Sequence, residues 1–172
     1  ETYQMLDENR LQWEKDGKEM VCVPAGQFFY GSNNKIVTLP DFWIDKTPVT
    51  NAEFQRFIKA NPDYPLPNSD NPAIAHLNWN PATRTYLPGQ GDYPVVLINW
   101  HDANAYAEWV GKRLPTDEEW EKAARGTEGR LYPWGDISPQ PDFCNFGRHE
   151  NGPTPVGKYS PNGDSPFGCA DM

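Results

Sequence analysis

The chain has 172 residues, and its 15 Lys and Arg against 24 Asp and Glu give a net charge of −9. This charge argues against nucleic acid or an anionic membrane surface as a partner, and no apolar run approaches the ~20 residues of a membrane-spanning helix. Eighteen Pro and 14 Gly beside 7 Trp, 8 Tyr and 8 Phe predict one loop-rich domain held together by aromatic side chains.

The first third of the chain predicts an arm followed by short strands. Residues 1–18 are polar, with only a loosely helical spacing of their larger side chains, and we interpret them as an N-terminal arm or linker. Strands are expected at residues 20–24, 27–30 and 41–46, because apolar residues cluster or alternate there between turn signals.

A first helix is predicted to begin after Thr50. Thr50 and Glu53 have the spacing of a capping box, in which two side chains satisfy backbone N–H groups at a helix start. The apolar residues Phe54, Phe57 and Ile58 then follow at helical spacing, so they should form the buried face. The helix is expected to end by residues 61–62.

The middle of the chain predicts a long loop, a strand and a second helix. Residues 62–91 carry repeated prolines, and a loop of this length in a compact domain is often functional. Residues 93–100 are predicted to form a buried strand, and residues 102–110 a helix that ends at Gly111 as its C-cap.

A third helix is predicted from Asp117, because Thr116 and Glu119 form a second capping box. Trp120, Ala123 and Ala124 should share its apolar face, and Gly126 should end it. No regular element is expected after Gly135. The pattern of short strands and two or three short helices predicts an α+β fold.

Several stretches together resemble the formylglycine-generating-enzyme family, the sulfatase-modifying factors. The longest is RLPTDEEWEKAARG followed by YPWGD, and the others occur in the family's order at residues 20–32, 43–58, 93–116 and 154–172. The resemblance implies an elaborated, loop-rich C-type-lectin-like fold. We expect this domain to span residues 19–172, incomplete at its C-terminal end.

The resemblance also implies an activity. Active members of the family use O2 and copper(I) to convert a cysteine of a sulfatase to formylglycine, and hold the copper by two cysteines after a GNVWEW-type motif. This sequence ends at Met172, where that motif would begin. We therefore assign a catalytic role to none of Cys22, Cys144 and Cys169. Either the chain is the front part of a longer protein, which we favour, or the domain has lost its catalytic region.

Calcium is a second expectation from the resemblance. The family holds Ca²⁺ through an Asn side chain, the next carbonyl and a second pair of oxygen ligands, and Asn145 and Phe146 match the first pair. Glu150 or Asn151 is the guess for the second pair. The alternative is that Asn145 caps a turn.

The remaining candidates are weaker. His76, His101 and His149 lack ligand spacing, and a related branch, the ergothioneine-forming sulfoxide synthases, holds iron through histidines of an additional N-terminal domain; we expect structural or surface histidines here. Glu118, Glu119 and Glu121 are expected on a solvated helix face. Most tryptophans should pack in the core, and Trp79 on the proline-rich loop is the predicted ligand contact.

Two functions therefore stay open at this point. The first is a non-catalytic, ligand- or protein-binding module, such as bacterial relatives carry beside an upstream domain. The second is the N-terminal part of a copper-dependent oxidase acting on a sulfatase-type peptide. No signal peptide is recognisable and Glu1 is not an initiator residue, so we expect a soluble processed product or a fragment, in a compartment that the sequence leaves open.

Overall fold

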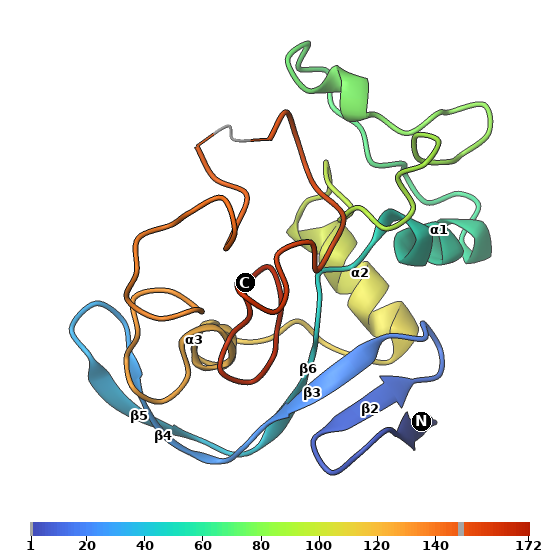
Figure 1. The fold of residues 1–172 in the computed structure, drawn as a ribbon. Coiled ribbons are helices and arrows are strands. Elements are labelled where there is room, and N and C mark those ends of the chain that lie inside the picture. The colour runs from blue at the N-terminus through green and yellow to red at the C-terminus, as the bar shows by residue number, and fades with distance from the viewer. Residues whose placement is uncertain (1, 148–149) are drawn as a thin grey trace. The chain divides into compact units, whose positions relative to one another are not determined.

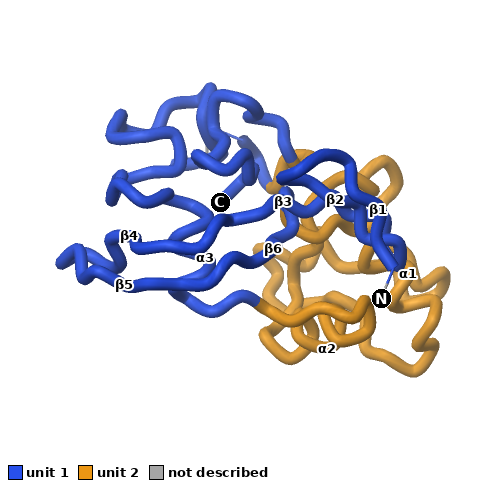
Figure 2. The backbone as a smooth tube through the Cα atoms, turned by 90° about the horizontal axis from the view of Figure 1, so that it is seen from below, with its two compact units in different colours: residues 1–47, 115–152, 157–172 blue, residues 48–114, 153–156 orange. Residues whose placement is uncertain are grey.

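The structure is a computed structural model that describes residues 2–147 and 150–172. The chain divides into two compact units, shown in different colours in Figure 2. Unit 1 comprises residues 1–47, 115–152 and 157–172, and unit 2 comprises residues 48–114 and 153–156. The chain thus leaves unit 1 at residue 48 and returns to it at residue 115.

Unit 1 contains two antiparallel sheets (Figure 1). The larger sheet has the strand order β1-β2-β3-β6, built from β1 (Tyr3–Met5), β2 (Arg10–Trp13), β3 (Glu19–Val23) and β6 (Phe42–Asp45). The smaller sheet is a ribbon of β4 (Gly26–Tyr30) and β5 (Lys35–Leu39). The strands expected at 20–24, 27–30 and 41–46 are confirmed, whereas β5 was not predicted from the sequence.

The N-terminal segment, interpreted from the sequence as an arm or linker, forms two strands. β1 and β2 form a hairpin, and β2 pairs with β3 with Leu11 opposite Met20. Leu11 is buried, at 3% exposure. The first part of the predicted arm therefore contributes to the sheet of unit 1, while the boundary between residues 18 and 19 stays a prediction.

Helix α3 (Asp117–Arg125) begins and ends as predicted. The Thr116 hydroxyl accepts from the Glu119 backbone N–H, and the Glu119 carboxylate accepts from the Thr116 N–H at 2.8 Å. One part of the predicted face is wrong: Trp120 is 47% exposed, whereas Lys122 is completely buried. In Figure 1 the helix lies beside β4, which it contacts.

The core of unit 1 joins β3 to α3 and to the C-terminal segment. Val21, Val23, Ala123 and Cys169 form its buried cluster. The Ala170 N–H donates to the Lys46 carbonyl at 2.8 Å, which fixes the C-terminal segment beside the end of β6. Residues far apart in the sequence therefore share one small core.

Unit 2 is held together by aromatic packing between two helices. These are α1 (Asn51–Ala60), with the predicted Thr50–Glu53 capping box, and α2 (Trp100–Val110). Its buried cluster consists of Phe54, Phe57, Ile58, Trp79, Tyr106 and Val110. The predicted inner face of α1 is thus confirmed, and the long loop adds Trp79 together with a short 3₁₀ turn, η1 (Ala75–Leu77).

The strand predicted at residues 93–100 is wrong. Only an isolated bridge between Thr50 and Pro94 forms there, and Leu97 has a φ of 61°, which an extended strand does not allow. Helix α2 begins at Trp100, because Asn99 accepts hydrogen bonds from the His101 and Asp102 N–H groups and Asp102 completes a capping box. Gly111 ends the helix with φ 81°, as expected for a C-cap.

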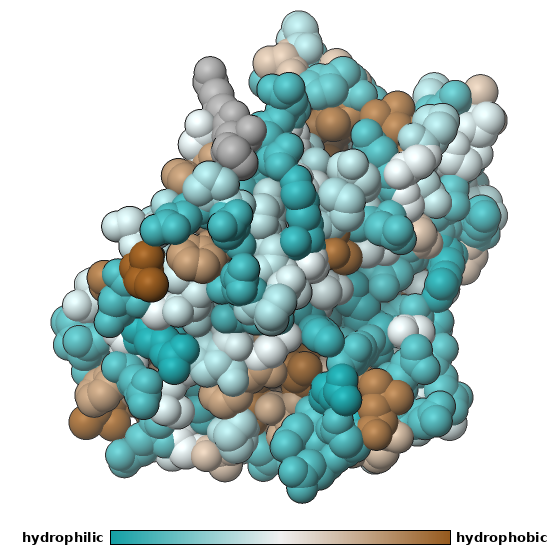
Figure 3. Space-filling model, viewed as in Figure 1, coloured by the Kyte–Doolittle hydropathy of each residue, from teal (hydrophilic) through white to brown (hydrophobic). Residues whose placement is uncertain are grey.

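The surface matches the composition. Figure 3 shows a face on which hydrophilic residues predominate and hydrophobic ones form small separate groups. Among the residues that the structure describes, no helix has both the length and the apolar character needed to cross a membrane.

Candidate functional site

A groove of about 790 Å³ opens within unit 1. It is lined by one polar wall from the β1–β2 turn and β2, by a thiol of β3, and by apolar side chains from the connection after β3 and from the C-terminal segment. The lining residues are Asp7, Glu8, Asn9, Arg10, Cys22, Pro24, Pro166 and Phe167. Its volume falls in the range of clefts that take a small ligand.

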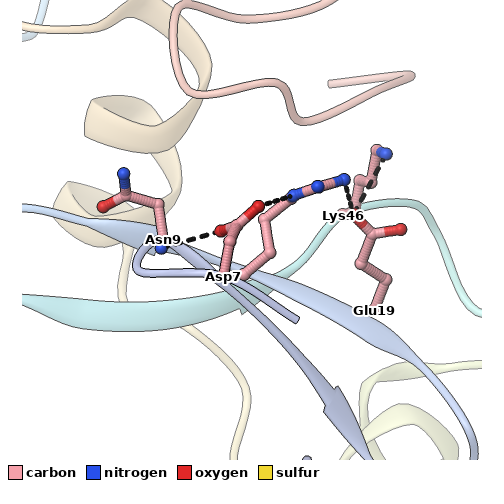
Figure 4. A network of polar contacts seen from close by, with 5 residues as sticks. Asp7, Asn9, Glu19 and Lys46 are labelled. Carbon is pink, nitrogen blue, oxygen red and sulfur yellow. Dashed lines mark hydrogen bonds and ion pairs between the residues drawn. The ribbon is translucent and has the colours of Figure 1, made fainter. Parts of the chain in front are cut away.

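The polar wall is fixed by hydrogen bonds within the turn (Figure 4). The Asp7 carboxylate accepts from the Asn9 backbone N–H at 2.9 Å and from Arg10 Nε at 2.7 Å. The N–H groups of Leu6 and Asp7 both donate to the Arg10 carbonyl, which closes the turn. The Asn9 hydrogen bond, and then Arg10, lower the pKa of Asp7, so its carboxylate stays charged.

The same wall continues as a chain of shared charges. Arg10 Nη1 lies 3.3 Å from Glu19 Oε1, and Lys46 Nζ lies 3.2 Å from the same oxygen. Figure 4 shows Asp7, Glu19 and Lys46 along this chain. All these side chains are at least 30% exposed, so solvent screens each pair and the pairs contribute little to stability. The network therefore positions charges along the groove more than it stabilises the fold.

Cys22 supplies the thiol of the groove. Its neighbours Val21 and Val23 pack in the core with Ala123 and Cys169, so strand alternation turns Cys22 to the opposite face of β3. Its backbone N–H donates to the Asn9 carbonyl at 2.9 Å, which holds the polar turn against β3. Burial, and then the charge of Asp41, raise the pKa of Cys22, so the thiol is neutral near pH 7.

The three cysteines do not fit a copper(I) site. All are free, and β3 separates the side chain of Cys22 from that of Cys169. Burial raises the pKa of Cys169 to about 11 and also raises the pKa of Cys144. Copper(I) is bound by thiolates, and the described residues contain no group of three or more His, Cys, Asp or Glu that could hold a metal. That none of these cysteines is catalytic stays a prediction.

Trp79 lies in the core of unit 2. It is 4% exposed and packs edge to face against Phe54 and Tyr86, at centroid distances of 6.2 and 5.6 Å. Its backbone N–H donates to the Pro67 carbonyl at 3.2 Å. The predicted ligand contact stays a prediction, and this packing leaves little of the indole surface for it.

Asn145 is exposed, and its side-chain amide donates to the Gly152 carbonyl at 2.8 Å. Phe146 is 39% exposed. Glu150, one guess for the second ligand pair, forms an ion pair with Lys158. The Asn145 amide oxygen and the Phe146 carbonyl are two neutral oxygen ligands, and a calcium site would need further oxygen ligands beside them. Calcium thus stays a prediction of the family resemblance.

The other candidates have structural or surface positions where they are described. His76 lies in η1 and His101 in α2, both exposed, and His149 falls outside the described residues. The solvated face predicted for the glutamates is wrong for two of them. Glu119 is 7% exposed in its capping box, and Glu121 accepts from the Gly31 N–H at 2.7 Å and pairs with Arg125.

Sequence reasoning missed the groove. Its walls come from three stretches separated by the rest of unit 1, and no periodic pattern marks them. The only local signal is Asp-x-Asn at Asp7 and Asn9, because Asp side chains often accept from the backbone two residues on.

Comparison with known proteins identifies the family. A model of the sulfatase-modifying factor enzyme 1-like domain matches residues 7–172. The chain belongs to this family. The family resemblance found at residues 20–172 is thereby confirmed, and the match begins earlier, at residue 7.

Relatives in the sulfatase-modifying factor family carry different names. Hercynine oxygenase of Mycolicibacterium smegmatis is 35% identical over 88% of this chain, and the formylglycine-generating enzyme of Streptomyces coelicolor is 37% identical over 74%. "Inactive C-alpha-formylglycine-generating enzyme 2" of Bos taurus is 32% identical over 89%. The matches cover 42%, 54% and 67% of these relatives' own lengths, respectively.

A solved structure has the same fold. PvdO from Pseudomonas aeruginosa matches 96% of this chain and 72% of its own with a TM-score of 0.71, at 24% identity. The predicted α+β, loop-rich fold of the formylglycine-generating-enzyme type is confirmed.

Proposed function

We propose that this chain acts as a non-catalytic binding module of the sulfatase-modifying factor family, with a ligand or protein taken up in the groove of unit 1. The groove supports the proposal because it combines charged side chains, an apolar surface and a partly accessible thiol around one open volume. Fold alone does not decide this, since one fold carries many functions.

The observation that carries the proposal is the state of the three cysteines. Cys22 lies in the groove, Cys169 is buried in the core beneath β3, and Cys144 belongs to the segment before Asn145. Burial raises the pKa of all three. A copper oxidase needs two convergent thiolates, and this set does not supply them. The relative named as inactive supports the same interpretation.

The alternative is that the chain forms the N-terminal part of a copper-dependent oxidase acting on a sulfatase cysteine. Its support is the relatives named formylglycine-generating enzyme and hercynine oxygenase, at 37% and 35% identity. In that case two further cysteines would come from sequence outside residues 1–172.

The deciding experiment measures the natural protein. Its intact mass and C-terminal peptide are determined, and the same preparation is titrated with copper(I) against a competing chelator. The binding module predicts no stoichiometric copper binding, whatever the mass of the natural protein. A larger mass, with a cysteine pair beyond Met172 and tight copper binding that Cys→Ser changes in that pair abolish, would establish the oxidase instead.

Calcium is a separate hypothesis with its own test. If Asn145 and Phe146 belong to a calcium site, added Ca²⁺ should raise the melting temperature of the wild type and raise that of Asn145→Ala less. The quantity compared is the rise in melting temperature that calcium causes in each protein. The melting temperatures themselves are not compared, because Asn145→Ala also loses the hydrogen bond to Gly152. An unchanged wild-type melting curve would reject calcium without touching the groove.

A further inference from the structure

Among the described residues, one carboxylate of the groove has no partner. Asp7 is paired with Arg10, and Arg10 is shared with Glu19. Glu8 lies between Asp7 and Arg10 in the β1–β2 turn. It makes no hydrogen bond or ion pair with any residue that the structure describes. Because the Asp7 and Arg10 charges offset each other, the groove has a local excess of one negative charge, and Glu8 is its source.

The other wall is apolar. Pro24 and Pro166 are exposed, and Phe167 is half-buried with its inner side against the core cluster. The proline rings present apolar surface that suits an alkyl stem, and the phenylalanine ring has a flat aromatic face that suits a planar cation. A fitting ligand therefore has an apolar or planar body and a positive charge.

We propose that the groove binds an arginine side chain of a partner polypeptide. The guanidinium pairs with Glu8, while its plane and the alkyl stem pack on Pro24, Pro166 and Phe167. Arginine suits this site better than lysine, because its planar cation stacks on flat surfaces and meets a carboxylate with two parallel hydrogen bonds. This inference rests on the proposed binding function and names the class of its ligand.

The size of the groove favours a polypeptide over a free amino acid. Its 790 Å³ is in the range that holds a drug-sized ligand, and one arginine side chain fills only part of it. The neighbouring residues of a chain would occupy the rest. The net charge of −9 further favours the approach of a basic segment.

The position of Cys22 in the groove supplies a direct test. The chain is alkylated with iodoacetamide, with and without the probe acetyl-Gly-Arg-Gly-amide, and the modification at each cysteine is followed by mass spectrometry of its peptide. The probe should slow alkylation of Cys22. Cys144, which is partly accessible but does not line the groove, is the internal control and should be unaffected.

Two further probes test whether binding needs the positive charge and whether the ligand is a polypeptide. A peptide with citrulline in place of arginine has nearly the same shape without the charge and should protect Cys22 less. Free argininamide tests the source, and it should protect less than the peptide. Equal protection by citrulline would overturn the role of the charge, and equal protection by argininamide would overturn the polypeptide.

Glu8→Gln should weaken protection by the arginine peptide about two- to fivefold, the range of a solvent-accessible ion pair. Glu14→Gln is the matched control, because Glu14 is exposed, lies outside the groove, and its side chain has no partner among the described residues. Equal effects of the two variants, or no protection by any probe, would refute the arginine site. The copper and mass measurements stand apart from this result, so the binding module can survive its failure.

Discussion

Lys122 and Pro24, 98 positions apart in the sequence, are joined by a hydrogen bond of 2.6 Å between Lys122 Nζ and the Pro24 carbonyl oxygen. The same ammonium group donates to the Gly26 carbonyl at 3.2 Å. Lys122 is completely buried, and this burial lowers its pKa. The contact ties α3 to the connection between β3 and β4, where Pro24 also lines the groove.

Lys122→Met should lower the free energy of unfolding near neutral pH by about 1–3 kcal/mol, because two carbonyls lose their charged donor. The difference from wild type should also grow as pH rises toward 10.5. The unfolded lysine keeps its proton up to that pH, whereas the folded one releases it earlier. The unfolded state thus binds more protons, and wild-type stability gains with pH.

Denaturant unfolding at a series of alkaline pH values tests this prediction. Lys35→Met is the control for losing a lysine charge, because Lys35 lies exposed on β5 and its replacement should change the free energy of unfolding only slightly. A Lys122→Met difference that stays flat or shrinks with rising pH would mean that the buried ammonium is not destabilised by its surroundings.

Local chemistry predicted the helices, and non-local pairing explains most of what was missed. The capping residues Thr50 and Thr116 act within one turn, so their sequence spacing is sufficient. At Asn99 the partner is Asp102 in place of Glu or Gln, and the apolar run before it was mistaken for a strand. On α3, Lys122 is buried because two distant carbonyls receive it, which helical periodicity cannot indicate.

The candidate site was less predictable than the fold. Its polar turn, its thiol and its Pro166 wall meet only because β2 pairs with β3 and the C-terminal segment packs on the same core. Conversely, Trp79 stood out in the sequence through its position in a proline-rich loop, yet loops of this kind are often held by a buried aromatic anchor. The residue singled out in the sequence and the residues that line the groove are therefore different sets here.

Trp79 should behave as a core residue. Trp79→Ala should lower the free energy of unfolding by about 3–5 kcal/mol, because it leaves a cavity beside Phe54 and Tyr86. Trp79→Phe should cost less and leave the protection of Cys22 by the arginine peptide unchanged. Trp100→Ala, at a tryptophan that is 64% exposed, should stay within about 0.5 kcal/mol of wild type. Loss of peptide protection in a folded Trp79→Phe protein would instead support the predicted ligand contact.

The capping box of α3 should make a measurable contribution. Thr116→Ala removes the oxygen that accepts from the Glu119 N–H, and should cost about 0.5–2 kcal/mol of stability. Thr116→Ser keeps that oxygen and should restore most of it. Thr127→Ala, at an exposed threonine just after the helix, is the control and should have little effect. Equal stability of the Ala and Ser variants at position 116 would show that the cap contributes nothing.

Gly126 couples the end of α3 to the wall of the groove. Its φ of 72° and ψ of −153° belong to a region that glycine alone adopts readily. A Cβ there would also lie 2.8 Å from Pro166 Cγ, too close for either to stay in place. Gly126→Ala should therefore lower the free energy of unfolding by about 1–3 kcal/mol and displace Pro166.

Gly89 is the control, because it has a positive φ without a neighbour that an added Cβ would displace. Gly89 has a φ of 78°, and a Cβ at that position would have nothing within 4 Å, so Gly89→Ala has the backbone strain without the clash. Both variants should be less stable than the wild type, and Gly126→Ala should lose more stability than Gly89→Ala. Only Gly126→Ala should weaken the protection of Cys22 by the arginine peptide. If both variants retained full protection, the Pro166 wall would not contribute to peptide binding, and the apolar half of the proposed site would have to be abandoned.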